Sequence, residues 1–408
     1  MRFTTLHDWL AWQETQHAKQ IDLGLERSRP VLQRLGLQQP AYTVISVAGT
    51  NGKGSSVAFL EAMLRAAGYR VGAYSSPHLL RYNERIRLNG AEVDDTQLCA
   101  AFERIDQARQ DISLTYFEFG TLAAFDIFQR AGVDVAVLEV GMGGRLDATN
   151  LLDADAALIT SIGIDHIEFL GPDRESIGRE KAGIFRPGRP AICADPEPPR
   201  SLIAYAEQLA APLYMLGHDF GYTVQADAWS WWGRNTAQGI SHYTGLPFPK
   251  LAGAFQLQNA AGAIMTVAQL AERLSAVQRE SISAGLVTVN LQGRFQVIPG
   301  LVTRVFDVAH NPHGARVLAQ ALRAQACAGR TLAVFAMLGD KDIPGVLEVM
   351  HSVIDEWHVA GLALARAATA NQMAQHLVQY TAPVCTHANV AEAYLHALAA
   401  AQPGDRVV

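Results

Sequence analysis

The residues most able to do chemistry form a glycine-rich segment near the start of the sequence. An apolar, β-branched run at 42–48 precedes this segment, and a helix-like run at 55–68 ends it. The segment consists of Gly49, Thr50, Asn51, Gly52, Lys53, Gly54 and Ser55. Glycines let backbone N–H groups and the helix start point at phosphate oxygens, Lys53 adds a positive charge, and Ser55 can offer a hydroxyl to Mg²⁺. The pattern predicts a phosphate loop that binds ATP.

The spacing of this loop differs from the common form G-x-x-x-x-G-K-[ST]. Val47 stands where the first glycine would be, and Gly54 separates Lys53 from Ser55. A glycine-rich turn without a ligand is the alternative interpretation, but the order strand, loop, helix favours a nucleotide. A P-loop kinase or GTPase fits poorly, because the spacing is wrong and no guanine-reading N-K-x-D segment is evident.

Glu139 is the first candidate for holding the metal. It lies at the carboxyl end of the apolar run 134–140 and is followed by a glycine-rich stretch, 141–144. In open α/β sheets, ligands sit beyond the carboxyl ends of the strands, and a carboxylate there can hold Mg²⁺ directly or through water. The alternative is that Glu139 only ends a strand or pairs with Arg145.

His166 is a second candidate, since it follows the apolar run 156–162 at the same kind of strand end. Imidazole is an unusual Mg²⁺ ligand, so chemistry alone favours a packed or surface histidine. Further polar residues lie where a second domain could touch a nucleotide, although solvated side chains, salt bridges and caps would look alike. These residues are Lys181, Arg294, Asp307 and His310.

Short apolar runs alternate with longer amphipathic stretches along the whole chain. The runs are 42–48, 134–140, 156–162, 302–309 and 331–338. Fully buried parallel strands have this continuous apolar character, so we expect an α/β fold with crossover helices. Gly and Pro cluster at 289–300 before a new strand–helix series, which predicts an N-terminal domain of residues 1–292 and a smaller C-terminal domain of residues 293–408.

Other segments give narrower expectations. Region 212–250 contains Trp229, Trp231 and Trp232 near Gly and Pro residues, which indicates a hairpin insertion, and 256–274 is helix-like. The final residues, GDRVV, look like the start of a strand, so we expect the natural chain to continue.

Composition indicates a soluble, two-domain enzyme of the cytoplasm. The chain has 408 residues, 49% of them hydrophobic, which exceeds the usual size of a single domain. Its net charge of −6 is scattered, so no nucleic-acid face is indicated. The four cysteines lack the paired spacing of a zinc or redox site. We find neither a signal peptide nor an apolar stretch long enough to span a membrane.

Ten ordered segments resemble the bifunctional dihydrofolate synthase and folylpolyglutamate synthase family, which is similar in turn to the Mur ligases. The segments are IDLGLERS (21–28), VAGTNGKGSS (47–56), YSSPHLLRYNERIRLNG (74–90), YFEFGTLAAF (116–125), LEVGMGGRLDATN (138–150), SIGIDHIEFLG (161–171), REKAGIFRPG (179–188), GRFQ (293–296), DVAHNPHG (307–314) and MLGDKD (337–342). The resemblance implies a P-loop ATPase domain with a mostly parallel sheet, followed by a Rossmann-like C-terminal domain that completes the ATP and glutamate site.

The resemblance also assigns residues to roles. It adds Asn259, Arg294 and Asp307 to the ATP site, and His310 to the catalytic candidates. It assigns metal ligation to Ser76, Glu139 and His166, and so favours a role for His166 that chemistry alone did not. Lys181 matches a lysine that the family carboxylates with CO₂. The implied pterin pocket contains Ile21, Asp22, Leu23, Thr115, Tyr116, Phe117, Glu118 and Leu146, although the aromatic residues alone would indicate ordinary helix-entry packing.

The implied activity is ATP-dependent amide ligation. Its partners would be ATP with one or two Mg²⁺ ions, L-glutamate, and dihydropteroate or a reduced folate, and the chain would act as a monomer. A Mur-type ligase acting on a UDP-sugar peptide is one alternative, but it would need a further domain before the loop at residue 49. A nucleotide-binding regulator without activity is another alternative. The joint presence of five residues argues against it: Lys53, Glu139, Lys181, Arg294 and Asp307.

Overall fold

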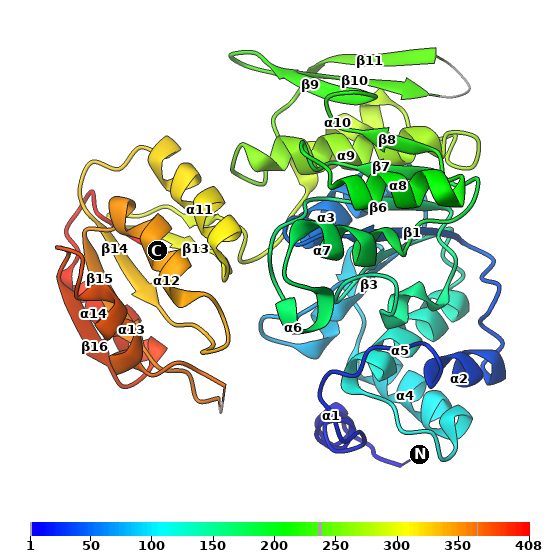
Figure 1. Ribbon diagram of the computed structural model, residues 1–408, viewed down its shortest axis with the longest axis horizontal. Helices are drawn as coiled ribbons and strands as arrows, with labels where there is room; N and C mark the ends of the chain where they lie inside the picture. Colours follow the sequence, from blue (N-terminus) through cyan, green and yellow to red (C-terminus); the bar gives the residue numbers. More distant parts are fainter. Residues whose placement is uncertain (1, 236–238, 365) are drawn as a thin grey trace. The chain divides into compact units, whose positions relative to one another are not determined.

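The computed structural model describes residues 2–235, 239–364 and 366–408. The chain divides into two compact units (Figure 1). The first consists of Met1–Lys250 and Gln256–Asn290, and the second of Leu251–Phe255 and Leu291–Val408. The sequence had placed the boundary between residues 292 and 293. None of the described helices has the length and apolar character that crossing a membrane requires.

The first unit is built on an eight-stranded sheet of order β4-β3-β2-β5-β1-β6-β7-β8. The strands are β1 (Thr43–Ala48), β2 (Val71–Tyr74), β3 (Ile86–Leu88), β4 (Ala91–Glu92), β5 (Val135–Glu139), β6 (Ala156–Ile159), β7 (Ala191–Cys193) and β8 (Leu213–Met215). The neighbours from β2 to β8 pair in parallel, whereas β3 and β4 form an antiparallel edge. The expected α/β architecture is confirmed.

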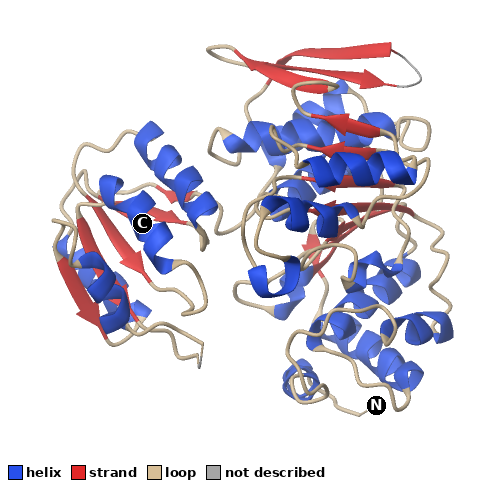
Figure 2. Ribbon diagram, in the orientation of Figure 1, coloured by secondary structure: helices blue, strands red, loops and turns tan. Residues whose placement is uncertain are grey.

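Helices lie on both faces of this sheet and form a further layer near the N-terminus (Figures 1 and 2). They are α1 (Leu6–Gln13), α2 (Ser28–Arg34), α3 (Lys53–Ala66), α4 (Asp95–Arg109), α5 (Tyr116–Ala131), α6 (Ile167–Leu170), α7 (Arg174–Ala182), α8 (Arg200–Leu209), α9 (Phe255–Gln269) and α10 (Arg279–Thr288), with short 3₁₀ helices at Tyr82–Arg85 and Ala148–Leu151. Helix α3 is buried from Gly54 to Leu64, as expected of a helix surrounded by sheet and α10. This burial fixes the phosphate loop at its start.

The tryptophan-rich region forms a separate antiparallel sheet of order β11-β10-β9. Its strands are β9 (Phe220–Val224), β10 (Trp229–Asn235) and β11 (Gly239–Leu246), which confirms the expected hairpin for the described residues. The buried Trp231 donates its indole N–H to the carbonyl of Ala261 in α9 at 3.2 Å, and so fastens this sheet to that helix within the first unit.

The second unit holds a six-stranded sheet of order β12-β13-β17-β14-β15-β16, with β12 antiparallel. Its elements are β12 (Gln296–Ile298), β13 (Thr303–Phe306), α11 (Pro312–Ala324), β14 (Thr331–Phe335), α12 (Ile343–Met350), a 3₁₀ helix at His351–Val353, β15 (Glu356–Ala360), α13 (Ala370–Leu377), β16 (Val384–His387), α14 (Val390–Ala400) and β17 (Arg406–Val407). The GDRVV segment is therefore strand β17, paired with β13 and β14.

The expected helix over 256–274 was too long. Helix α9 ends at Gln269, where the N–H of Leu270 turns to the carbonyl of Val267 at 3.1 Å. Such a bond to the third residue back tightens the last turn and stops the α-helix. Apolar periodicity continues beyond that point because Leu270 and Leu274 still pack into the core.

Candidate active site

The phosphate loop is held by its neighbours at the carboxyl end of β1. Gly49 and Gly52 have φ values of +153° and +88°. A Cβ at Gly49 would lie 1.9 Å from Oγ1 of Thr160, and one at Gly52 would lie 2.4 Å from Oδ1 of Asn259. Both glycines are therefore required by conformation and by space, and Asn259 on α9 packs directly against the loop.

Lys53 and Ser55 extend from the first turn of α3. The ammonium group of Lys53 donates to the carbonyls of Gly49 at 3.0 Å and Thr50 at 3.3 Å. Ser55 is buried, and its hydroxyl accepts from Nε2 of Gln256 at 3.2 Å. Asn259 donates in turn to Oε1 of Gln256 at 3.1 Å, which links α9 to the loop.

Three expected metal ligands gather at one edge of the sheet. Glu139 ends β5 as a buried carboxylate and lies beside Val47 in the register of β1. Ser76 follows β2 and donates its backbone N–H to Oε2 of Glu139 at 3.3 Å. His166, which precedes α6, lines the same cavity as Ser76. A carboxylate, a serine and a histidine that follow neighbouring strands at one edge of the sheet offer donor types that a divalent cation can accept. Neither Glu139 nor Ser55 is among the residues that line this cavity.

A cavity of about 260 Å³ opens beside these residues in the first unit. Of the expected pterin residues, Ile21, Asp22, Leu23, Thr115, Phe117, Glu118 and Leu146 line it. Tyr116 does not, because its ring packs against Tyr82 with 5.5 Å between the ring centroids. Residues not expected from the sequence also line it, including Arg85 and Asp147.

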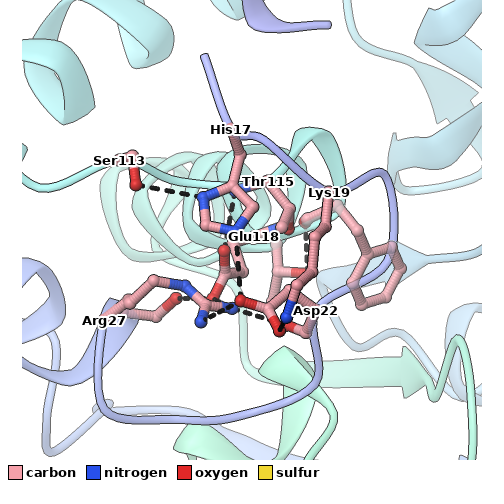
Figure 3. Close-up of polar contacts among 10 residues, drawn as sticks. His17, Lys19, Asp22, Arg27, Ser113, Thr115 and Glu118 are labelled. Atoms are coloured by element: carbon pink, nitrogen blue, oxygen red, sulfur yellow. Dashed lines mark hydrogen bonds and ion pairs between the residues drawn. The ribbon is translucent and has the colours of Figure 1, made fainter. Parts of the chain in front are cut away.

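Asp22 and Glu118, which line the cavity, belong to a charged network that forms one of its walls. Figure 3 shows the polar contacts of this network. Arg27 joins the two carboxylates, because it donates to Oδ2 of Asp22 at 2.6 Å and to Oε1 of Glu118 at 3.1 Å. His17 lies 3.0 Å from Asp22, and Lys19 donates to Asp22 at 3.4 Å. The contact with His17, followed by the charge of Arg27, lowers the pKa of Asp22 despite partial desolvation.

Glu118 also shapes its own helix. Its Oε2 accepts from the N–H of Thr115 at 2.7 Å, while the hydroxyl of Thr115 accepts from the N–H of Glu118 at 3.2 Å. This capping box fixes the start of α5 and therefore the position of Phe117. Arg27 and His17 were not expected in this network from the sequence, although Arg27 lies in the segment IDLGLERS and its charge is a signal that could have indicated it.

Lys181 lies near the phosphate loop, buried near the end of α7. Burial and, after it, the positive charge of Lys53 lower the pKa of its amine to about 7, although Asp165 and Asp147 oppose the shift. A large fraction of this lysine is therefore neutral and nucleophilic near neutral pH.

The remaining candidates lie in the second unit. Asp307 follows β13 and accepts from the N–H groups of Phe295 and Ala309, both at 2.8 Å, while burial raises its pKa. Arg294 donates to the carbonyl of Gly293 at 3.2 Å. His310 is exposed, with Nδ1 3.0 Å from the carbonyl of Val308. The two hydrogen bonds that Asp307 accepts thus hold the turn at 293–295 against the segment before α11.

Comparison with known proteins shows which domain families these two units match. Residues 47–267 match the Mur ligase middle domain, and residues 293–408 match the Mur ligase glutamate ligase domain. The dihydrofolate synthase/folylpolyglutamate synthase of Escherichia coli strain K12 is 47% identical over 375 residues, which cover 91% of this chain and 85% of that protein.

Solved structures agree. E. coli FolC in complex with DHPP and ADP superposes with a TM-score of 0.92 at 46% identity, covering 99% of this chain and 94% of that one. A bifunctional folylpolyglutamate synthase/dihydrofolate synthase with Mn, AMPPNP and L-glutamate bound gives 0.90 at 45% identity, with the same coverage. The chain belongs to the dihydrofolate synthase/folylpolyglutamate synthase family, which is built from Mur ligase domains.

Proposed function

We propose that this protein is an ATP-dependent ligase that joins L-glutamate to dihydropteroate and to folyl(poly)glutamate through an acyl phosphate. One observation carries the proposal. Neighbouring parallel strands bring the phosphate loop, Ser76, Glu139 and His166 to the same edge of one sheet, beside the cavity that Phe117 lines. A nucleotide, a divalent ion and a flat substrate would therefore meet at one place.

The chemistry follows from the weakness of a carboxylate as an electrophile. We propose that the substrate carboxylate attacks the γ-phosphorus of ATP, so that ADP leaves and an acyl phosphate forms. The glutamate amine then attacks the acyl carbon and phosphate leaves. Lys53 and the loop N–H groups stabilise negative charge on the transferring phosphoryl group. Arg294, Asp307 and His310 are proposed to assist with the nucleotide and the incoming glutamate.

We propose that Ser76, Glu139 and His166 hold the divalent ion, with Ser55 as a further oxygen donor. The ion neutralises charge on the phosphates when it is bound. The position of Glu139, a buried carboxylate at the end of β5 that accepts from the N–H of Ser76, supports this assignment, because Mg²⁺ prefers oxygen ligands. The relative with Mn and AMPPNP bound is consistent with it.

We propose that the cavity binds the pterin part of the substrate. Phe117 offers an aromatic face, and Asp22 and Glu118 offer carboxylate oxygens to ring N–H groups. Arg27 holds both carboxylates in place, so the wall is organised before a ligand arrives. The FolC complex with DHPP supports this choice of ligand.

The test compares acceptors with the purified full-length chain. ATP, Mg²⁺ and glutamate are supplied with dihydropteroate, tetrahydrofolate or neither, and ADP, phosphate and the ligated product are measured. We expect glutamate-dependent product with both acceptors and little ADP without an acceptor. If neither dihydropteroate nor tetrahydrofolate gives product, the proposal is refuted. If only one of them gives product, the proposal is restricted to that activity. Sedimentation and cell fractionation test the further proposal of a cytoplasmic monomer.

A further inference from the structure

The second unit carries a group of side chains that could ligate a metal and that have no part in the proposed ligase mechanism. His387 ends β16, and Glu392 and His396 lie on α14, which packs beside β16 (Figure 1). One ligand atom from each of these side chains lies within 4.8 Å of the others. All three side chains reach the surface, with His396 the most exposed.

The arrangement suits a tetrahedral ion. Glu392 and His396 are four residues apart on one helix, so they share a face. A zinc ion bound at ordinary lengths needs ligand atoms about 3.3 Å apart, a contraction that exposed side chains can make by rotation. The backbone around the cluster is already fixed, because Asn389 caps α14 through the N–H of Glu392 at 2.9 Å and Glu392 accepts from the N–H of Ala388 at 3.1 Å.

A second layer of side chains lies behind His387. Nδ1 of the buried His358 is 3.0 Å from Nε2 of His387, and the two rings stack at 5.2 Å. Nε2 of His358 lies 3.2 Å from Oε1 of Glu356 but makes no hydrogen bond. Histidine ligands of metals are commonly oriented by such a partner on the other ring nitrogen.

We propose that His387, Glu392 and His396 bind a divalent transition-metal ion of the zinc class, with water at the fourth position. Two imidazoles and one carboxylate match this class better than Mg²⁺, which prefers oxygen ligands alone. His387 also lines an open hollow of about 720 Å³, so the ion can enter from solvent. Because β16 is the edge strand of its sheet, the ion would fasten that edge to α14.

The experiment measures metal uptake by the full-length chain. Protein stripped with chelator is dialysed against Zn²⁺ in an excess of Mg²⁺, and bound zinc per chain is measured for wild type, Glu392→Gln, His396→Ala and His376→Ala. His376 is an exposed histidine of the same unit, so its variant is the matched control. Co²⁺ replaces Zn²⁺ in a second series, because a tetrahedral N/O site gives visible absorption bands.

We expect Glu392→Gln and His396→Ala to lose one zinc per chain, or to bind it at least tenfold more weakly. The Co²⁺ bands should disappear in the same two variants and remain in His376→Ala. Equal zinc uptake in all four proteins would refute the site. Equal losses in His376→Ala would refute it as well, since that result would mean dispersed surface binding.

Discussion

Lys53 occupies the point in the loop where a positive charge is most useful. Its ammonium bridges the carbonyls of Gly49 and Thr50, so it is positioned before a phosphate arrives. We expect Lys53→Ala to reduce kcat by roughly 10²- to 10³-fold, as for loss of one preorganised charge-stabilising donor. The free energy of unfolding should change by less than about 1 kcal/mol. Steady-state kinetics and chemical denaturation measure the two effects.

The control is Lys250→Ala, which removes an exposed lysine from the same unit. It should leave both quantities unchanged. Wild-type turnover in Lys53→Ala would show that this loop does not bind the phosphates of ATP through Lys53.

Lys181 provides a pH-dependent test. Its pKa of about 7 means that the neutral fraction rises from roughly one tenth at pH 6 to nine tenths at pH 8. A neutral amine adds to CO₂ and loses a proton to form a carbamate, so we expect the adduct to increase over this range. A lysine with the usual value of 10.5 would stay protonated throughout. Carbon-13 NMR of protein in ¹³C-labelled bicarbonate measures the adduct.

Lys181→Arg supplies the control, because a guanidinium forms no carbamate under these conditions. The carbamate signal should be absent from that variant. A signal that persists in it, or that does not change with pH, would contradict the assignment.

At the scale of elements, buried runs of sequence predicted the structure best. The strands β1, β5 and β6 lie inside the expected runs, because parallel strands covered on both faces must be apolar throughout. The cavity wall was harder to predict. Arg27 and Glu118 meet across 91 positions of sequence, and no local pattern shows that two such side chains will pair. Family resemblance identified Glu118, whereas Arg27 emerged only from the folded arrangement.

A comparison of Gly52, in the phosphate loop, with Gly68, just after α3, separates the effect of backbone strain from that of steric crowding. Gly52 and Gly68 have φ values of +88° and +89°, but only at Gly52 would a Cβ meet a neighbour, Asn259. Each alanine variant should lose about 1 kcal/mol of stability through backbone strain. We expect only Gly52→Ala to weaken ATP binding strongly, since it also moves the loop or Asn259. Calorimetry of ATP binding and thermal unfolding test this, and equal ATP affinity in both variants would contradict it.

The charged wall can be tested through substrate binding. Arg27→Met keeps the length of the side chain but leaves Asp22 and Glu118 as adjacent, partly desolvated carboxylates. We expect the KM for dihydropteroate to rise roughly tenfold, with a smaller change in kcat, because we propose that the wall contacts the pterin, which does not react. Arg29→Met, an exposed neighbour, is the control. An unchanged KM in Arg27→Met would show that the wall does not contact the substrate.

At the scale of the whole molecule, the two units contain different sets of the residues expected from the sequence. The first contains the phosphate loop, the metal candidates and the cavity that we propose binds the pterin, and most of the residues expected for the pterin line that cavity. The second contains Arg294, Asp307 and His310, and their roles stay predictions from resemblance. The proposed metal site of that unit, His387, Glu392 and His396, was not expected from the sequence. His358, which lies behind it, is 29 positions from His387 and meets it only through neighbouring strands.

The central claim is that the substrate carboxylate is activated as an acyl phosphate before glutamate reacts. The direct measurement supplies ATP, Mg²⁺ and dihydropteroate without glutamate, adds hydroxylamine, and quantifies the hydroxamate and the product nucleotide. Attack at the γ-phosphorus gives ADP, whereas attack at the α-phosphorus gives AMP and pyrophosphate. We predict dihydropteroyl hydroxamate with an equal amount of ADP. AMP as the stoichiometric product, or ADP without any hydroxamate, would contradict the account.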